Sequence, residues 1–254
     1  MKMAEKKIVE LYENKDQAVI AAIDKIVVEI YNKNADKEKS QSIILTGCSP
    51  LTGTTSTCIG LSIALANTKR KVLFVDCDVR KSIRYKKLNQ TTTLGLSDYL
   101  VQDDTYEMSW EEIVYSTNID NLFYIPCGTY SQNSTRILCS EQMNVLMQMV
   151  KEYYDFIIFD FPSINIVPDA QILFKNVDGI ILMSALGETR KEQIKLAKMK
   201  VAPFEEKYYG MIINKIPRDV YKRNVRNYDY YFTDKRGEQK LGKRITRKKH
   251  KEIE

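Results

Sequence analysis

The stretch Gly-Cys-Ser-Pro-Leu-Thr-Gly-Thr-Thr, residues 47–55, decides how the rest of the chain is interpreted. It follows the apolar run Ile43–Leu45 and precedes a helical pattern from Ser56 to Asn67. A glycine-rich loop between a strand and the helix that it opens is typical of a phosphate-binding loop, or P-loop, because the N–H groups at the helix start point at the anion. Thr54, however, stands where that motif has its lysine. The sequence therefore predicts a P-loop that lacks one positive charge.

Apolar runs on both sides of this loop predict the fold. Six of them predict strands: Ser42–Thr46, Lys71–Asp76, Asn121–Pro126, Asp155–Asp160, Asp178–Ser184 and Tyr208–Asn214. They are continuous rather than alternating, as expected for strands that a parallel sheet buries on both faces. Other segments have a helical pattern: Gln17–Tyr31, Ser56–Asn67, Thr135–Tyr153 and Thr189–Val201. Strands alternating with helices predict an α/β fold of the P-loop NTPase type, with a doubly wound, mostly parallel sheet flanked by helices.

The length of 254 residues suits one large α/β domain. We expect an N-terminal helix and linker over residues 1–39, the α/β domain over residues 40–217, and a basic, tyrosine-containing tail over residues 218–254. No apolar stretch is long enough to span a bilayer, and the charged N-terminus has no signal-peptide core. These features predict a cytoplasmic protein.

Cysteine, histidine and charge restrict the classes of ligand. The five cysteines include no Cys-x-x-Cys pair and the only histidine, His250, lies in the tail, so a zinc-type site is not expected. The net charge of +6 is uneven: residues 213–254 contain 14 Lys and Arg against 6 Asp and Glu, which leaves −2 on the first 212 residues. Such a basic tail attracts anionic membrane surfaces or nucleic acid, and a solvated, disordered end is the alternative.

Acidic residues end two of the predicted strands. Asp76 and Asp78 follow the second strand, and Asp160 ends the fourth. Ligands of an open α/β sheet bind at the carboxyl ends of its strands. Mg²⁺ bound beside phosphates takes carboxylates, a Ser or Thr hydroxyl and waters, and Thr55 is a suitable hydroxyl. These residues therefore predict a Mg²⁺–phosphate site, although a single strand-terminal Asp is often only a helix cap.

Several motifs occur together in an order that resembles one family. The matching stretches are residues 46–53 (its Walker A), 72–81 (its Walker A′), 95–100 (Gly-Leu-Ser-Asp-Tyr-Leu), 156–162 (its Walker B), 167–170 (Val-Pro-Asp-Ala), 187–190 and 210–214. The chain resembles the bacterial tyrosine kinases, or BY-kinases, over about residues 40–232. These kinases are the cytoplasmic partners of capsule and exopolysaccharide chain-length regulators, and Walker A′ separates them from ordinary P-loop kinases.

The resemblance implies a site for ATP and Mg²⁺ at which tyrosine is phosphorylated. It implies nucleotide contacts for these residues: Gly47, Ser49, Gly53, Thr54, Thr55, Ser56 and Asn214. It implies these metal ligands: Thr55, Asp76, Asp78 and Asp160. Asp76 or Asp78 would also accept the proton of the attacking tyrosine. The phosphate acceptors would be in the tail: Tyr221, Tyr228, Tyr230 and Tyr231. For these tyrosines, packing of an aromatic end onto the sheet is the alternative.

The chain departs from the family's pattern at several positions. Thr54 replaces the P-loop lysine, and the first predicted helix lacks the Glu-x-x-Arg-x-x-Arg stretch that builds the family's ring-shaped oligomer. The family's Pro-Asn-Pro-x-Glu segment reads Gln-Asn-Ser-Thr-Arg at residues 132–136, and its Thr-Pro-Pro reads Phe-Pro-Ser at residues 161–163. A charge-assisted hydrogen bond contributes about 1.5–3 kcal/mol, so we expect weaker nucleotide binding and still weaker phosphoryl transfer. Three basic residues are candidates to replace the lysine: Arg80, Lys81 and Arg190.

Three functions are consistent with this sequence. The first is a BY-kinase-like nucleotide-binding regulator of capsular or exopolysaccharide biosynthesis with impaired or absent kinase activity, a pseudokinase peripheral to the inner face of the cell membrane that binds a membrane-spanning chain-length regulator. The second is an active ATP-dependent tyrosine autokinase. The third is a partition-type ATPase, against which the tyrosine tail and the absence of a signature lysine near Cys48 both argue. Nucleic-acid binding is not expected, and the sequence leaves the oligomer and the polysaccharide open.

Overall fold

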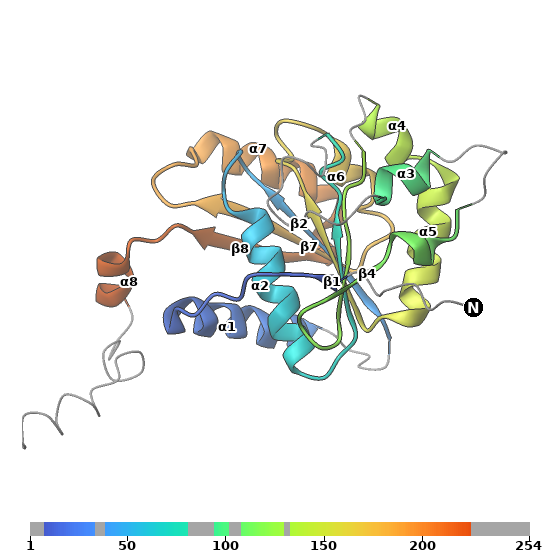
Figure 1. Cartoon of the computed structure of the whole chain (residues 1–254). Helices are drawn as coiled ribbons and strands as arrows, with labels where there is room; N and C mark the ends of the chain where they lie inside the picture. The colour runs from blue at the N-terminus through green and yellow to red at the C-terminus, as the bar shows by residue number, and fades with distance from the viewer. Residues whose placement is uncertain (1–7, 34–38, 81–93, 102–107, 130–132, 225–254) are drawn as a thin grey trace, which may run out of the picture. The chain divides into compact units, whose positions relative to one another are not determined.

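The computed structural model of the chain describes residues 8–33, 39–80, 94–101, 108–129 and 133–224. The chain separates into two units, Met1–Lys215 and Ile216–Glu254. The first unit contains the sheet and the helices that cover it (Figure 1). The second unit is described only by one short helix, α8 (Arg218–Asn224), and its neighbouring residues.

The described strands form one eight-stranded sheet, in the order β1-β4-β5-β3-β6-β2-β7-β8. Their bounds are β1 (Ile8–Val9), β2 (Gln41–Gly47), β3 (Val72–Asp76), β4 (Tyr115–Thr117), β5 (Leu122–Ile125), β6 (Phe156–Phe161), β7 (Gly179–Ala185) and β8 (Tyr208–Asn214). The strand pairs are parallel except for β4 with β5. The doubly wound, mostly parallel sheet predicted from the sequence is therefore confirmed.

The central strands are buried on both faces, which explains their continuous apolar sequences. Every residue of β2, β6 and β7 is buried. Along β2, Ile43 and Leu45 belong to one core cluster, whereas Ile44 between them belongs to the other. Successive side chains of a strand point to opposite faces, so one run of aliphatic residues serves two cores.

Helices cover both faces of the sheet. The described helices of the first unit are α1 (Gln17–Lys33), α2 (Thr54–Asn67), α3 (Leu96–Leu100), α4 (Ser134–Leu138), α5 (Glu141–Tyr153), α6 (Asp169–Ile172) and α7 (Lys191–Val201), with 3₁₀ turns at Trp110–Ile113 and Ala202–Lys207. Ile30 of α1 and Leu61 of α2 belong to the same core cluster as Ile43, and the two helices lie side by side in Figure 1. Leu146 of α5 and Val201 of α7 belong to the opposite cluster with Ile44.

Some predicted boundaries were wrong. The single helix predicted over Thr135–Tyr153 is two helices, α4 and α5, because Ser140 has extended backbone angles (φ −70°, ψ 159°). The Ser140 hydroxyl donates to Ile137 O at 2.7 Å and accepts from Met143 N at 3.4 Å, which ends one helix and begins the next. The short strands β1 and β4 were not predicted. In the described part of the chain, no helix has the length and apolar character needed to cross a membrane.

Candidate nucleotide site

The loop between β2 and α2 needs its two glycines for steric reasons. A Cβ atom on Gly47 would lie 2.6 Å from Thr52 Oγ1 and 2.7 Å from Ser49 O. Gly53 has φ +83°, and a Cβ atom there would lie 2.3 Å from Asn214 Nδ2. A glycine tolerates both the close approach and the left-handed backbone. The glycines thus shape a compact turn directly before α2.

The ends of the neighbouring strands fix this loop in place. Cys48 N donates to Met183 O of β7 at 2.7 Å, and Cys48 O accepts from Asn165 Nδ2 at 2.8 Å. Asn214 at the end of β8 donates from Nδ2 to Thr52 O at 2.9 Å. Asn214, predicted to contact a nucleotide, therefore touches the loop backbone in this structure. Hydrogen bonds to β7, to Asn165 and to the end of β8 thus anchor the backbone of the loop.

A hydrogen bond between two hydroxyls also joins the loop to the segment after β7. Ser49 Oγ lies 2.9 Å from Thr189 Oγ1, and Thr189 Oγ1 accepts from Ala185 N at 2.9 Å. The helix α7 begins at Lys191, two residues later than the helical pattern predicted, because Arg190 is its N-cap, with extended backbone angles and its N–H donated to Gln193 Oε1 at 2.9 Å. Ser49, another predicted nucleotide contact, thus has a structural partner in this conformation.

The start of α2 is suited to an anion. Gly53 stands at the N-cap position and offers no side chain to cap the helix, and the first turn has no acidic residue. Thr57 N donates to Gly53 O at 3.0 Å, so the N–H groups before it lie at the open end of the helix. Thr54, Thr55 and Ser56, all predicted nucleotide contacts, occupy this first turn. A 14-residue helix adds its dipole, which favours negative charge at this end.

Thr54 brings no positive charge to that end. Its hydroxyl lies 3.1 Å from the hydroxyl of Thr52, so the position of the motif's lysine is filled by a neutral hydroxyl pair. Of the candidates to replace the lysine, Arg80 is bound to Asp169 and Arg190 is exposed at the N-cap of α7. Lys81 lies outside the described residues.

Three predicted acidic residues come together beside the loop. Asp76 of β3 and Asp160 of β6 are direct neighbours in the parallel register, and Cys77 N donates to Asp160 O at 2.9 Å. Asp78 N donates to Asp76 Oδ1 at 3.0 Å. The three aspartates are only 1%, 7% and 2% exposed, for Asp76, Asp78 and Asp160 in that order. Burying carboxylates is costly in water-free surroundings, so this edge suits a divalent cation.

The donor set fits Mg²⁺ only together with phosphate groups. Within the described ranges, no group of three or more His, Cys, Asp and Glu side chains is arranged to hold a metal ion by itself. Mg²⁺ usually keeps several waters and is bound by one or two carboxylates and the substrate's phosphates. Carboxylates beside a phosphate-type loop match that requirement.

A tyrosine that the sequence did not single out lies against this acidic edge. Tyr124 of β5 is 2% exposed, and its ring stacks on Phe74 with centroids 5.2 Å apart. Burial raises the pKa of Tyr124 well above its ordinary value, and the charges of Asp76, Cys127 and Asp160 and a side-chain hydrogen bond with Asp76 add to this. The phenol therefore keeps its proton to a higher pH than an ordinary tyrosine. The sequence signal available for Tyr124 was its position near the end of the predicted strand Asn121–Pro126. The pairing of this strand with β3, which ends at Asp76, is seen only in the structure.

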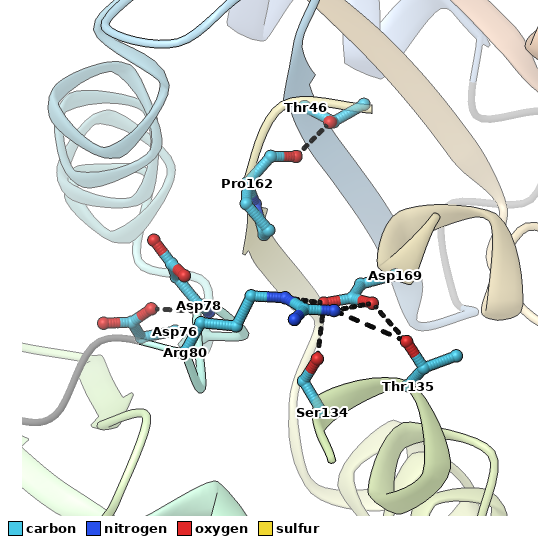
Figure 2. A network of polar contacts seen from close by, with 8 residues as sticks. All are labelled: Thr46, Asp76, Asp78, Arg80, Ser134, Thr135, Pro162 and Asp169. Carbon is cyan, nitrogen blue, oxygen red and sulfur yellow. Dashed lines mark hydrogen bonds and ion pairs between the residues drawn. The ribbon is translucent and has the colours of Figure 1, made fainter. Parts of the chain in front are cut away.

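A second polar cluster, which we call the Asp169 clamp, consists of Arg80, Ser134, Thr135 and Asp169 (Figure 2). Arg80 Nε donates to Asp169 Oδ2 and Arg80 Nη2 to Asp169 Oδ1, both at 3.1 Å. Ser134 Oγ donates to Oδ2 at 3.1 Å and Thr135 Oγ1 to Oδ1 at 2.9 Å. The Asp169 side chain is 1% exposed. Arg80 and Asp169 lie in matched motifs, but the sequence did not indicate that they pair.

The Gly-Leu-Ser-Asp-Tyr-Leu motif has a structural explanation. A Cβ atom on Gly95 would lie 2.4 Å from both Pro126 O and Gly128 N, so α3 approaches the end of β5 closely. Asp98 Oδ2 accepts from Gly95 N at 2.8 Å and Thr129 N at 3.2 Å. This motif therefore attaches α3 to the loop after β5.

The predicted phosphate acceptors are only partly within the described structure. Tyr221 belongs to α8, where its N–H donates to Pro217 O at 2.9 Å. Tyr228, Tyr230 and Tyr231 lie outside the described residues. Their role therefore stays a prediction.

Comparisons with known proteins agree with the motifs and the sheet. The chain matches the family model described as an AAA domain over residues 51–183. It is 33% identical over 191 residues to the tyrosine-protein kinase CpsD of Streptococcus pneumoniae, covering 74% of this chain and 82% of that relative. It is 33% identical over 174 residues to the tyrosine-protein kinase YwqD of Bacillus subtilis, covering 68% and 72%. The kinase domain of the Escherichia coli tyrosine kinase ETK shares the fold, with a TM-score of 0.71 and 22% identity over 81% of this chain and 79% of that one. The chain therefore belongs to the bacterial tyrosine-kinase (BY-kinase) family.

Proposed function

We propose that the chain is a nucleotide-binding regulator of capsular or exopolysaccharide biosynthesis whose tyrosine-kinase activity is weak or absent. The observation that carries this proposal is the hydroxyl pair of Thr54 and Thr52, 3.1 Å apart, at the position of the motif's lysine. The surrounding loop keeps the glycines, the open helix end and the strand anchors of a phosphate site.

Nucleotide binding is supported by groups that do not depend on the lysine. Backbone N–H groups from Ser49 to Thr55 would hold the phosphates at the start of α2. Thr55, Asp76, Asp78 and Asp160 would hold Mg²⁺, which supplies charge neutralisation at the phosphates when bound. Ser56 would add a hydroxyl in the same helical turn.

Loss of catalysis follows from the missing charge. Phosphoryl transfer depends on positioning and on neutralising charge at the transferred group, so one absent cation affects turnover more than binding. The loss of one charge-assisted hydrogen bond weakens ground-state binding about 10- to 100-fold. Arg80 would have to leave Asp169 to compensate, because both of its bonded nitrogens face that carboxylate.

The partner and the location follow from family membership as further parts of the proposal. A membrane-spanning chain-length regulator would bind the chain and keep it at the inner face of the membrane. The basic residues of the tail, 218–254, would add attraction to anionic lipid. Without the family's arginine motif in α1, the chain would not form the family's ring by that route.

Titration of Mg-ATP against the wild-type chain and the Thr54→Lys variant tests the proposal. We expect wild-type binding and a roughly 10- to 100-fold gain in affinity for Thr54→Lys. Thr54→Met is the matched control, since methionine adds length without charge, and it should give no gain. Radiolabelled ATP with the regulator present then measures phosphorylation of the tail tyrosines. Robust wild-type phosphorylation that disappears in Asp76→Asn would instead support an active autokinase.

A further inference from the structure

We propose that the Asp169 clamp positions the acidic loop after β3 for Mg²⁺, which makes Arg80 and Asp169 positioning residues of the nucleotide site. The inference rests on the proposed function, because it concerns the metal that accompanies the nucleotide. Neither residue belongs to the loop or to the first turn of α2, where the phosphates would bind. Both act through the placement of Asp76 and Asp78.

The loop after β3 places the clamp next to the acidic pair. Arg80 follows Asp78 by two residues, and the intervening Val79 is fully buried, as is Cys77. An arginine held by two parallel hydrogen bonds has a defined plane and direction, unlike a lysine held as a point charge. Holding the guanidinium restricts where the backbone at Arg80 can lie. The buried neighbours Cys77 and Val79 and the hydrogen bond from Asp78 N to Asp76 Oδ1 restrict it further, so Asp78 can move little relative to Asp76.

The other side of the clamp reaches the strand that carries Asp160. Asp169 is the first residue of α6, and the segment joining β6 to α6 is bonded to the end of β2. Thr46 Oγ1 donates to Pro162 O at 2.7 Å, and Ile164 N donates to Gly47 O at 3.0 Å (Figure 2 shows the first of these bonds). The clamp therefore joins the loop after β3 to the segment after β6, both of which follow strands with predicted metal ligands.

Stability is an insufficient reason for this arrangement. A buried ion pair often contributes little net stability, because removing two charges from water offsets their attraction. Asp169 nevertheless accepts four hydrogen bonds, two of them from hydroxyls of α4. Such a fully bonded carboxylate determines one orientation of its partner. Orientation matters for Mg²⁺, which demands near-ideal octahedral geometry.

The test is a Mg²⁺ titration of nucleotide binding, followed by the fluorescence of mant-ADP. For Arg80→Lys and Asp169→Asn, we expect the Mg²⁺ concentration at half-maximal binding to rise at least fivefold. Binding measured in EDTA should stay within twofold of wild type, because the phosphate loop is unchanged. Thr135→Val removes one hydroxyl from the clamp and should shift the Mg²⁺ midpoint in the same direction by a smaller factor, which keeps the test available if Asp169→Asn does not fold.

The matched control is Arg70→Lys. Arg70 pairs with Asp155 at the opposite end of β3, with Nη1 3.3 Å from Oδ1, and both side chains are more than one-third exposed. This control should leave the Mg²⁺ midpoint unchanged. Lower thermal stability of the clamp variants with an unchanged Mg²⁺ midpoint would overturn the inference and leave the proposed function intact.

A Mn²⁺ titration in the presence of inorganic phosphate, followed by electron paramagnetic resonance, separates the remaining outcomes, because the phosphate supplies the groups that the aspartates need beside the metal. Absence of mant-ADP binding in the wild type would overturn the proposed function. The Mn²⁺ titration would then decide the inference alone: weaker Mn²⁺ binding in Arg80→Lys than in Arg70→Lys supports it. Equal Mn²⁺ binding in both variants, or none in the wild type, overturns it.

Discussion

Charged residues gather at both ends of the parallel strands, but their surroundings differ. We call the side of the sheet where these strands begin the amino edge, and the side where they end the carboxyl edge. At the amino edge, Arg70 pairs with Asp155 and Lys151 with Asp178, and these side chains are between 31% and 41% exposed. At the carboxyl edge, the Arg80 side chain is 35% exposed, but its partner Asp169 has a side chain that is only 1% exposed, and Asp76 is 1% exposed. Water solvates the exposed pairs, whereas buried carboxylates depend on protein donors or a bound cation. Burial of the carboxylates, rather than the number of charges, distinguishes the edge that carries the candidate nucleotide site.

The largest expected difference between the edges is in the free energy of unfolding. Arg80→Ala leaves the Asp169 carboxylate buried with hydroxyl donors only, so we expect a loss of about 3–5 kcal/mol. Arg70→Ala breaks an exposed pair and should cost about 1 kcal/mol or less. Urea unfolding of both variants measures the contrast. Equal losses would show that burial does not distinguish the edges.

A comparison of Gly53 with Gly187 tests whether the nucleotide loop differs from an ordinary turn with positive φ. Gly53→Ala combines left-handed strain with an approach of 2.3 Å to Asn214 Nδ2, so we expect a loss of about 2–3 kcal/mol and of mant-ADP binding. Gly187 also has positive φ, at +76°, but a Cβ atom there meets nothing within 4 Å. Gly187→Ala should therefore cost only about 1–2 kcal/mol of strain and preserve binding. Loss of binding in both variants would contradict a special role for the loop.

Burial of Cys48 in the loop leads us to expect that the free energy of unfolding depends on pH. Burial raises the pKa of Cys48 to about 11 from 9.0, despite an opposing effect of Lys198. Between these pH values the folded chain keeps a proton that the unfolded chain loses, so stability falls as pH rises from about 9 towards 11. Urea unfolding across this range should show a shallower fall for Cys48→Ala. The same slope in wild type and variant would exclude Cys48 as the cause.

The smallest expected effect comes from an exposed ion pair at the carboxyl edge. Lys215 Nζ lies 2.7 Å from Glu188 Oε2, with side chains 38% and 56% exposed. Glu188→Gln should change the free energy of unfolding by less than about 1 kcal/mol, although the pair lies near the loop. Thermal or urea unfolding checks this value. A loss like that of Arg80→Ala would mean that location, not burial, sets the energy.

The strands were predictable because their sequences are locally unambiguous. All six predicted runs are strands, with ends within one residue, since a parallel sheet buried on both faces selects continuous apolar sequences. The break at Ser140 was missed because a serine cap is short and the apolar pattern continues through it. The two- and three-residue strands β1 and β4 are too short for a periodic signal.

The candidate site was predictable as a set of motifs but not as a set of contacts. The sequence placed Asp76 and Asp160 at strand ends, and adjacency of β3 and β6 made them neighbours. The pairing of Arg80 with Asp169 joins residues 89 positions apart, and Thr135 lies 34 positions from Asp169. Nothing in local spacing predicts which arginine meets which carboxylate.

The sequence by itself determined the alternation of strands and helices, the glycine loop, and the absence of the lysine at Thr54, because each depends on residue type and local spacing. Only the tertiary structure decided that Arg80 is bound to Asp169 and that Asp76 and Asp160 share one buried edge. These facts depend on the order in which the strands assemble, and that order is set by packing between segments far apart in the chain.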